Sequence, residues 1–238
     1  WLKWWDLIIK VNSKEITEKN PLQEVITWIK WPAWTKVTLT INRNWNIFDI
    51  DVIREKIIIT DIESKIINTR TYYIKIKSFW ENVSDDFKNS IEELEKNKNI
   101  NKIILDLRNN GGWYLSEVTE MLSYFIEKDE KTAVVKYNNK NKNYISRWYK
   151  NIDFNKYRII ILQNSWTASA SEILIWTLKD YFPKTTLIWE NTYWKWSVQV
   201  MRAYNDWSLL KYTIAKWFTW LNETWIDWVW IKPDIELE

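Results

Sequence analysis

Glycine is almost absent from this chain, and its absence constrains the turns that the chain can make. Of 238 residues only two are glycine, Gly111 and Gly112, whereas 21 are tryptophan. A usual glycine share of about 7% would give roughly 17 residues in this length. Glycine adopts positive φ without steric cost, so most tight turns here have to be made by other residues.

Tryptophan stands where such turns usually need glycine. The segments Asn44-Trp45-Asn46 and Asp206-Trp207-Ser208 each separate two alternating, strand-like runs, where Asn-Gly and Asp-Gly are typical. Lysine, isoleucine and asparagine are abundant, which indicates an AT-rich gene. We therefore predict that most of the tryptophans are glycines, encoded by UGA codons that a standard table reads as Trp. The alternative is a truly Trp-rich chain that binds sugars or a membrane interface through exposed indoles, but the tryptophans show no helical or strand periodicity.

The composition excludes several classes of chemistry. The chain has no histidine and no cysteine, so it can form neither a Ser-His-Asp triad nor a Cys nucleophile or Cys/His zinc site. A hydrolase built from this sequence must use Lys, Asp or Glu as its general base. The net charge of +3 gives no basic footprint for nucleic acid, and no stretch approaches 18 uncharged apolar residues. Because the chain begins at Trp1 and inside a motif, we expect any signal peptide or membrane anchor to lie upstream.

Residues 1–56 are predicted to form a small α+β module. A strand is expected at 7–11, and Asn20 and Pro21 mark the start of a helix. A hairpin is expected across Asn44-Trp45-Asn46. The apolar stripe of the predicted helix consists of Leu22, Val25, Ile26 and Ile29.

Residues 57–70 are predicted to be a connecting strand and turn, and 71–238 a larger domain. There, strands alternate with helices of ten or more residues, which indicates an α/β layer with a partly parallel sheet. The Lys/Asn tract 138–143 is expected to be a solvated loop. Strands are predicted at 72–76, 103–107, 133–137, 158–162, 187–188, 198–204 and 209–215, and helices at 84–95, 116–126 and 169–181.

Two loops follow buried apolar strands, which is where α/β folds place their sites. The first loop, 106–113, contains both glycines and leads into a helix, so it can present backbone N–H groups to an anion; a plain tight turn is the alternative. The second loop, 164–172, holds four hydroxyl residues at a strand-to-helix elbow. One of them can be a nucleophile assisted by the helix dipole, or all can be simple helix caps.

The presence of Lys195 favours a nucleophile in the second loop over simple helix caps. It lies between Trp194 and Trp196, and two glycines there would allow its backbone to pack closely and its stem to be buried. Burial disfavours the ammonium form and moves a lysine pKa from about 10.4 toward 7 to 8, where the amine can accept a proton from serine. Gln199 can accept a hydrogen bond from that amine and orient it.

With Trp read as Gly, the chain resembles the C-terminal-processing peptidases, or tail-specific proteases. These are serine proteases with a Ser-Lys pair and an embedded PDZ domain. The resemblance covers nearly the whole chain, and it implies a truncated PDZ domain followed by a protease core, a mixed sheet with flanking helices of the crotonase and Clp-protease kind. The matching segments, in the family's order, are WLKWWDLIIKVNSKEI, IKWPAWTKVTLTI, SFWENVSDDFKNSIEEL, IILDLRNNGGW, NSWTASASEILIWTLKDY, WENTYWKWSVQ and WVWIKPDIEL.

The resemblance also implies roles for individual residues. It makes Ser169 the nucleophile, Lys195 the general base and Gln199 its orienting partner, with the amides of Gly112 and Ala170 as the oxyanion hole. Positions of structural support in the family are matched by Arg108, Asn110 and Asp180. Capping and packing roles fit Thr167 and Ser171.

The implied function is endoproteolysis near the C-termini of protein substrates, through an acyl-enzyme and without metal or nucleotide. The compartment implied is the bacterial periplasm or envelope, with protein or peptide tails as partners. A catalytically silent relative that binds peptide tails is the alternative, and a relative with acyl-CoA chemistry would leave Lys195 and Gln199 unexplained.

The chain departs from the family pattern in several places. Gly111 replaces a usual proline, the spacing from Ser169 to Lys195 is one residue longer than usual, and the ligand-binding part of the PDZ domain is mostly missing. Trp217 matches a family aromatic and is expected to be genuine, whereas Trp28 and Trp148 stay ambiguous. If the tryptophans at 113, 166, 194 and 196 were genuine, their indoles would crowd both loops and would predict an inactive, poorly folded protein.

Overall fold

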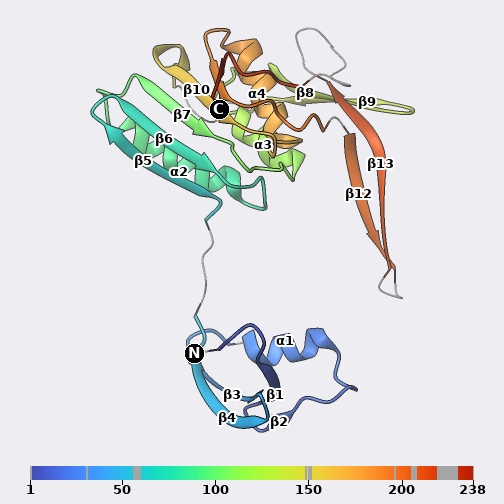
Figure 1. Ribbon diagram of the computed structural model, residues 1–238. Helices are drawn as coiled ribbons and strands as arrows, with labels where there is room; N and C mark the ends of the chain where they lie inside the picture. The colour runs from blue at the N-terminus through green and yellow to red at the C-terminus, as the bar shows by residue number, and fades with distance from the viewer. Residues whose placement is uncertain are drawn as a thin grey trace. The chain divides into compact units, whose positions relative to one another are not determined.

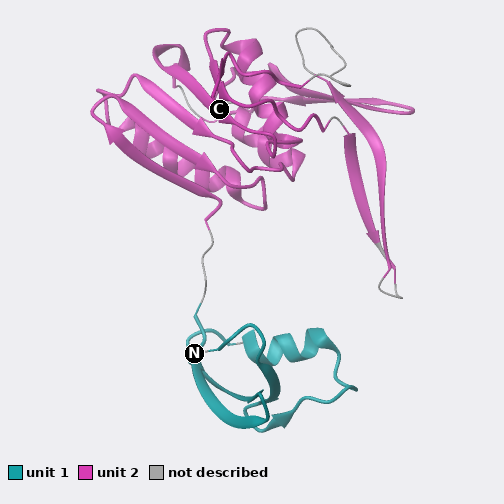
Figure 2. Ribbon diagram, in the orientation of Figure 1, with its two compact units in different colours: residues 1–59 teal, residues 60–238 magenta. Residues whose placement is uncertain are grey.

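The chain divides into two compact units, Trp1–Ile59 and Thr60–Glu238 (Figure 2). The computed structural model describes residues 2–30, 32–55, 60–147, 149, 152–195, 197–204, 208–218 and 230–237. The predicted turn at 206–208 falls mostly outside these residues, and so do Trp148 and Trp196.

The first unit is a four-stranded antiparallel sheet with one helix (Figure 1). A small core of Val11, Val37, Leu39 and Ile41 joins sheet to helix, and Trp28 packs on it half-buried. In sheet order β2-β1-β3-β4 the strands are Lys14–Glu15, Leu7–Val11, Lys36–Arg43 and Asn46–Ile53, and α1 spans Leu22–Lys30.

The predicted module is correct in its elements, with one error in the helix stripe. Leu22 is 74% exposed, because it stands at the first position of α1, where the helix has not yet turned its apolar face to the sheet. The predicted hairpin turn between β3 and β4 is present. Asn44 and Trp45 have φ of 51° and 69°, the pair of positive values that a type I′ turn requires.

The second unit is built on a six-stranded mixed sheet in the order β14-β11-β10-β7-β6-β5. All neighbours are parallel except β5, which pairs antiparallel with β6. The partly parallel sheet predicted from the strand–helix alternation is therefore confirmed. Its strands are Ile62–Asn68 (β5), Thr71–Ile76 (β6), Lys102–Asp106 (β7), Arg158–Gln163 (β10), Thr186–Trp189 (β11) and Ile235–Glu236 (β14).

Three helices pack against this sheet, and a short 3₁₀ turn precedes β10. Phe87, Ile91 and Leu94 form one fully buried face of α2, as their spacing predicts. The predicted helix 116–126 is shorter in the structure, because Ser123 caps it. The elements are Val83–Glu95 (α2), Leu115–Leu122 (α3), Ala170–Tyr181 (α4) and Phe154–Lys156 (η1).

A separate four-stranded antiparallel sheet has the order β12-β13-β8-β9. The loop prediction for 138–143 is confirmed for 138–140 and wrong for 141–143, because residues from Asn141 onward pair with β8 as a hairpin. Polar side chains suit that strand because its residues are mostly exposed. The strands are Lys131–Tyr137 (β8), Asn141–Ile145 (β9), Ser197–Ala203 (β12) and Leu209–Phe218 (β13).

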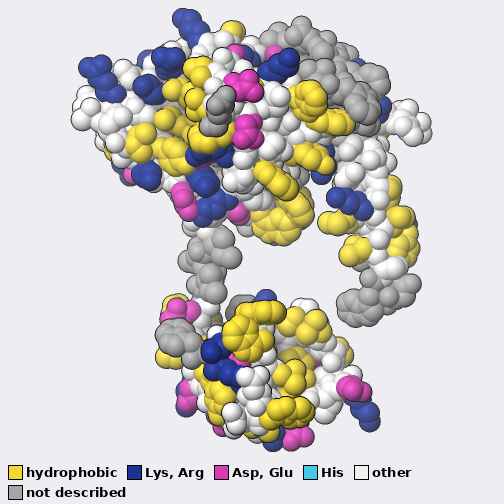
Figure 3. Space-filling view, viewed as in Figure 1, with side chains coloured by type: hydrophobic (Ala, Val, Ile, Leu, Met, Phe, Trp, Pro, Cys, Tyr) yellow, Lys and Arg dark blue, Asp and Glu magenta, His cyan; other side chains and the backbone are white. Residues whose placement is uncertain are grey.

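Many tryptophans lie in backbone or surface environments that suit glycine. Five described tryptophans have positive φ, a region that L-residues adopt rarely: Trp34, Trp45, Trp113, Trp189 and Trp194. Figure 3 shows hydrophobic side chains on the surface of both units, and Trp4 and Trp45 are at least 90% exposed. Trp217, expected to be genuine, is instead 2% exposed within the main core. These backbone angles support the predicted glycines.

Among the described residues, no helix has the length and apolar character needed to cross a membrane.

Candidate active site

The two predicted site loops lie together because their strands are neighbours. β7 and β10 pair in parallel, so the loops that follow them leave the same edge of the sheet. The side chains of Asn109 and Asn164 bond one loop to the other, with 2.8 Å between Asn164 Nδ2 and Asn109 Oδ1. The Ala168 N–H donates to the Asn110 carbonyl at 3.0 Å. Two loops that are far apart in the sequence are thus joined by hydrogen bonds.

Ser169 occupies the sharp turn between the second loop and α4. Its φ of 58° and ψ of −114° are strained for a residue with a side chain, and it is the N-cap of the helix. A turn of this kind holds a hydroxyl at a helix N-terminus, where the macrodipole favours a developing negative charge. Ser169 is half-buried.

Gly112 lies directly against this turn. Its φ is +91°, and a Cβ at this position would stand 2.6 Å from the Ala168 carbonyl oxygen and 2.7 Å from the Ala170 nitrogen. No residue with a side chain fits there without a shift of the backbone. The first loop therefore meets the Ser169 turn at the position where the sequence has a glycine.

The backbone N–H groups of Gly112 and Ala170 differ in whether they already have a hydrogen-bond acceptor. Among the described residues the Ala170 N–H, at the first position of α4, has no acceptor. The Gly112 N–H donates to Asn110 Oδ1 at 2.9 Å, so it is not the free donor that the resemblance implies. The cause is local: Asn110 is fully buried, and its side chain closes an Asx-type turn over the glycine.

Glu172 connects the Ser169 turn to the segment that carries Lys195, a role that was not predicted from the sequence. One carboxylate oxygen accepts from the N–H groups of Ser169 and Lys195, both at 2.8 Å. The other accepts from Thr192 Oγ1 at 2.7 Å and from the Trp194 N–H at 2.6 Å. The signal in the sequence was the Ser-x-x-Glu spacing of Ser169 and Glu172, which is a capping box.

Lys195 is half-buried, and its pKa lies below the usual lysine range. Burial is the main cause, and the positive charge of Lys211 adds to it, whereas the carboxylate of Glu172 opposes both. The indole N–H of Trp217 donates to the Lys195 carbonyl oxygen at 3.1 Å. This environment supports the neutral amine that a general base needs.

Gln199 lies on β12 and lines the same cavity as Lys195, but among the described residues it makes no hydrogen bond to it. The antiparallel register shifts between Val198 and Gln199, and such an irregularity turns a side chain away from its regular direction. Ser169 and Lys195 likewise make no side-chain hydrogen bond to each other. The cavity has a volume of about 520 Å³ and is lined by Tyr193, Trp194, Lys195, Ser197, Gln199, Lys211 and Thr213.

Arg108, Asn110, Thr167 and Ser171, which were expected to give support, capping or packing, do so within the two loops. Arg108 forms two hydrogen bonds to the buried carboxylate of Asp106 and stacks 4.5 Å from the ring centre of Trp189. Thr167 and Ser171 are fully buried, and their hydroxyls donate to backbone carbonyls of the first loop. Asp180 is half-buried near the C-terminal end of α4, at the opposite end of the helix from Ser169.

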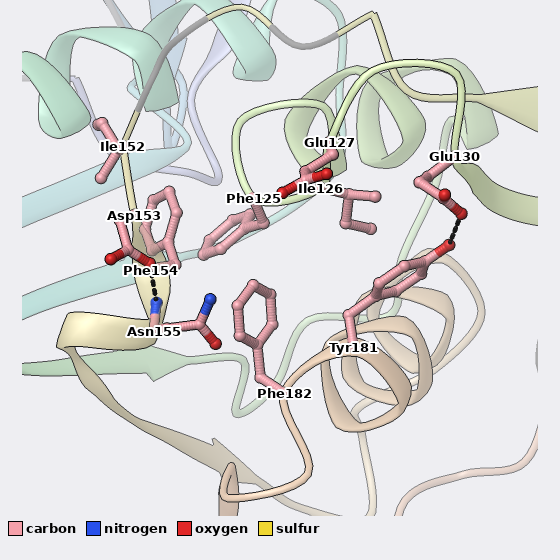
Figure 4. Close-up of a pocket in the computed structure, with 10 residues that line it drawn as sticks. All are labelled: Phe125, Ile126, Glu127, Glu130, Ile152, Asp153, Phe154, Asn155, Tyr181 and Phe182. Carbon is pink, nitrogen blue, oxygen red and sulfur yellow. Dashed lines mark hydrogen bonds between the residues drawn. The ribbon is translucent and has the colours of Figure 1, made fainter.

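A second cavity, of about 510 Å³, contains none of the predicted site residues (Figure 4). It lies where α4 ends near the segment before β10, and aromatic rings of Phe125, Phe154 and Phe182 face one another in it. Three acidic side chains stand at its margin: Glu127, Glu130 and Asp153. None of the residues that line this cavity belongs to the loops 106–113 and 164–172.

Comparison with known sequences finds a family match over most of the chain. The profile of peptidase family S41 matches residues 70–237. A probable CtpA-like serine protease of Staphylococcus saprophyticus is 35% identical over 239 residues, covering 98% of this chain and 46% of the relative. A protein of the same description from Staphylococcus aureus is 36% identical with the same coverage. The chain thus spans about half the length of these relatives.

Solved structures show the same fold. The photosystem II D1 C-terminal processing protease has a TM-score of 0.63 at 20% identity, with coverage of 98% of this chain and 63% of that one. A putative S41 protease from Bacteroides fragilis also has a TM-score of 0.63, at 16% identity, covering 98% and 66%.

Proposed function

The chain belongs to peptidase family S41, and from this we propose that it is the catalytic part of a serine endopeptidase that uses a Ser-Lys mechanism. Ser169 attacks the scissile carbonyl, and neutral Lys195 takes the hydroxyl proton. As the peptide bond breaks, the Lys195 ammonium gives this proton to the leaving amine and is neutral again. Water later hydrolyses the acyl-enzyme, with Lys195 again as the base.

The observation that carries this proposal is the shared carboxylate oxygen of Glu172. The backbone nitrogens of Ser169 and Lys195 both lie 2.8 Å from it, so they are within twice that distance of each other. A strained serine at a helix N-terminus and a half-buried lysine with a lowered pKa are thereby held in one site. These are the properties required of a nucleophile and its base.

We assign the oxyanion hole to the Ala170 amide and the neighbouring amide of Gly112. The Ala170 N–H has no acceptor in the described chain and belongs to a helix N-terminus. The substrate oxyanion would compete with Asn110 Oδ1 for the Gly112 N–H. Gln199 would orient the Lys195 amine after a change of its side-chain rotamer.

The substrates we propose are protein or peptide tails cut near their C-termini, in an extracytoplasmic compartment of a bacterium. The first unit is proposed to be part of a PDZ domain; its helix and antiparallel sheet, order β2-β1-β3-β4, are compatible with such a module. The proposed activity needs no cofactor.

The test is cleavage of peptides by the full-length protein in its predicted glycine-containing form. Ser169→Ala should lower kcat at least about a thousandfold while the protein stays folded by circular dichroism. Ser165→Ala is the matched control, because this exposed serine lies in the same loop and should leave kcat unchanged. Peptides with a free C-terminal carboxylate should be cleaved faster than their amidated forms. Undiminished cleavage by Ser169→Ala would exclude the serine assignment.

A further inference from the structure

We propose that Glu172 is a positioning residue that fixes the Lys195 segment to the Ser169 turn and so sets the geometry of the reacting pair. This inference rests on the proposed function, because it assigns a task to Glu172 within the same site. It goes beyond helix capping, which is the role that its position in α4 alone suggests.

The hydrogen bonds of Glu172 exceed what a capping box uses. In a capping box the glutamate accepts from the backbone of the N-cap residue, here the Ser169 N–H. Glu172 accepts three further hydrogen bonds, and all three come from residues 192–195. One carboxylate thus serves two segments, and most of its contacts belong to the segment that carries the proposed base.

The burial of Glu172 makes these contacts energetically important. Glu172 is 2% exposed, and burial raises the pKa of its carboxyl group by more than the hydrogen bonds lower it. A buried carboxylate is costly unless donors satisfy it. The four donors are therefore required, and a movement of the 192–195 segment away from α4 would leave the carboxylate with the Ser169 N–H alone.

The peptide units around Lys195 are held from both sides. The Lys195 N–H donates to Glu172, and its carbonyl accepts from the indole of Trp217. The Tyr193 N–H donates to the Thr167 carbonyl at 2.9 Å, and Thr192 also exchanges hydrogen bonds with Ile231. Of these contacts, those to Glu172 lead directly to Ser169, because the same oxygen binds both backbones.

Glu172→Gln and Glu172→Asp together separate the effect of position from the effect of charge. The amide keeps one acceptor oxygen but turns an NH₂ group toward two N–H donors, so the 192–195 segment has to shift. A displacement of about 1 Å in such a site can cost roughly a hundredfold in rate, so kcat should fall about 10- to 100-fold with KM little changed. The substitution also removes the negative charge of Glu172, which raises the pKa of Lys195. The pKa of Lys195 should therefore fall further, and the acidic limb of the kcat profile should move to lower pH. Glu172→Asp keeps the charge and should lower kcat with a smaller movement of that limb.

The matched control is Glu117→Gln. Glu117 also accepts two hydrogen bonds from another element, the N–H and hydroxyl of Ser84, but lies outside the site. This variant should leave kcat and its pH limb unchanged.

A second readout does not depend on activity. Amide hydrogen exchange should speed up at least about tenfold at Trp194 and Lys195 in both Glu172 variants, and stay unchanged in the central strand β7. If the unmodified protein cuts no peptide, the proposed function fails, and the exchange data alone then decide whether Glu172 holds the segment. If the protein is active and both variants keep normal kcat, pH limb and exchange, the role of Glu172 is overturned while the proposed function stands. Should Glu172→Gln not fold, Glu172→Asp and Thr192→Val give the same decision.

Discussion

Gly112→Ala should damage the protein more than any other single methyl group added to the first loop. A Cβ at residue 112 would meet backbone atoms at 2.6 Å and 2.7 Å, and the residue has a φ of +91°. The left-handed backbone alone costs an L-residue about 1–2 kcal/mol. Crowding against a backbone that cannot rotate away adds about 1–3 kcal/mol. We therefore expect the free energy of unfolding to fall by about 2–5 kcal/mol.

The neighbouring glycine supplies the control. A Cβ on Gly111 would meet nothing within 4 Å, and Gly111 has no positive φ, so Gly111→Ala should change the unfolding free energy by less than about 0.5 kcal/mol. Urea unfolding of the full-length protein, followed by tryptophan fluorescence, measures both variants. In a peptidase assay, Gly112→Ala should also lose about 10²- to 10³-fold in kcat, because the oxyanion donors would be displaced. Equal stability of the two variants would refute the close contact between Gly112 and the Ser169 turn.

Two further predictions concern the base and the turns. Lys211→Met removes a positive charge that lowers the pKa of Lys195, so the acidic limb of kcat/KM should move to higher pH, whereas Lys128→Met, an exposed change elsewhere, should not move it. A limb that stays in place, or moves to lower pH, would contradict the assignment of Lys195 as the base. Trp45→Gly should stabilise the first unit by about 1 kcal/mol, because it relieves a positive φ at a 93% exposed side chain, and urea unfolding monitored by amide exchange in β3 and β4 measures this. Trp28→Gly is the counterpart and should destabilise the unit, since Trp28 packs on its core; a loss of stability in Trp45→Gly would argue against glycine at that turn.

Much of the second unit could be predicted because its signals are local or follow from topology. Buried apolar strands and amphipathic helices have characteristic spacing, and parallel neighbours bring the loops after β7 and β10 together. Glu172 could not be assigned in the same way. Its sequence position indicates a cap, and only the fold brings residues 192–195 to its carboxylate.

The remaining differences also arise from long-range structure. The direction of Gln199 depends on an irregular register with β13, which leaves no mark in the spacing of residues. The polar tract at 138–143 lacks the alternation of a half-buried strand, yet its second half forms an edge hairpin with β8 that needs no apolar face.

The proposed nucleophile and base are carried by different sheets. Ser169 follows β10 of the six-stranded sheet, whereas Lys195 precedes β12 of the four-stranded sheet. Three hydrogen bonds to Glu172 hold the second segment against α4, and a hydrogen bond in a protein has a net worth of roughly 0.5–1.5 kcal/mol. Together these three hydrogen bonds contribute about 1.5–4.5 kcal/mol to holding the Lys195 segment beside Ser169. Loss of these bonds would loosen the contact between the proposed nucleophile and the proposed base without breaking any strand pairing in either sheet.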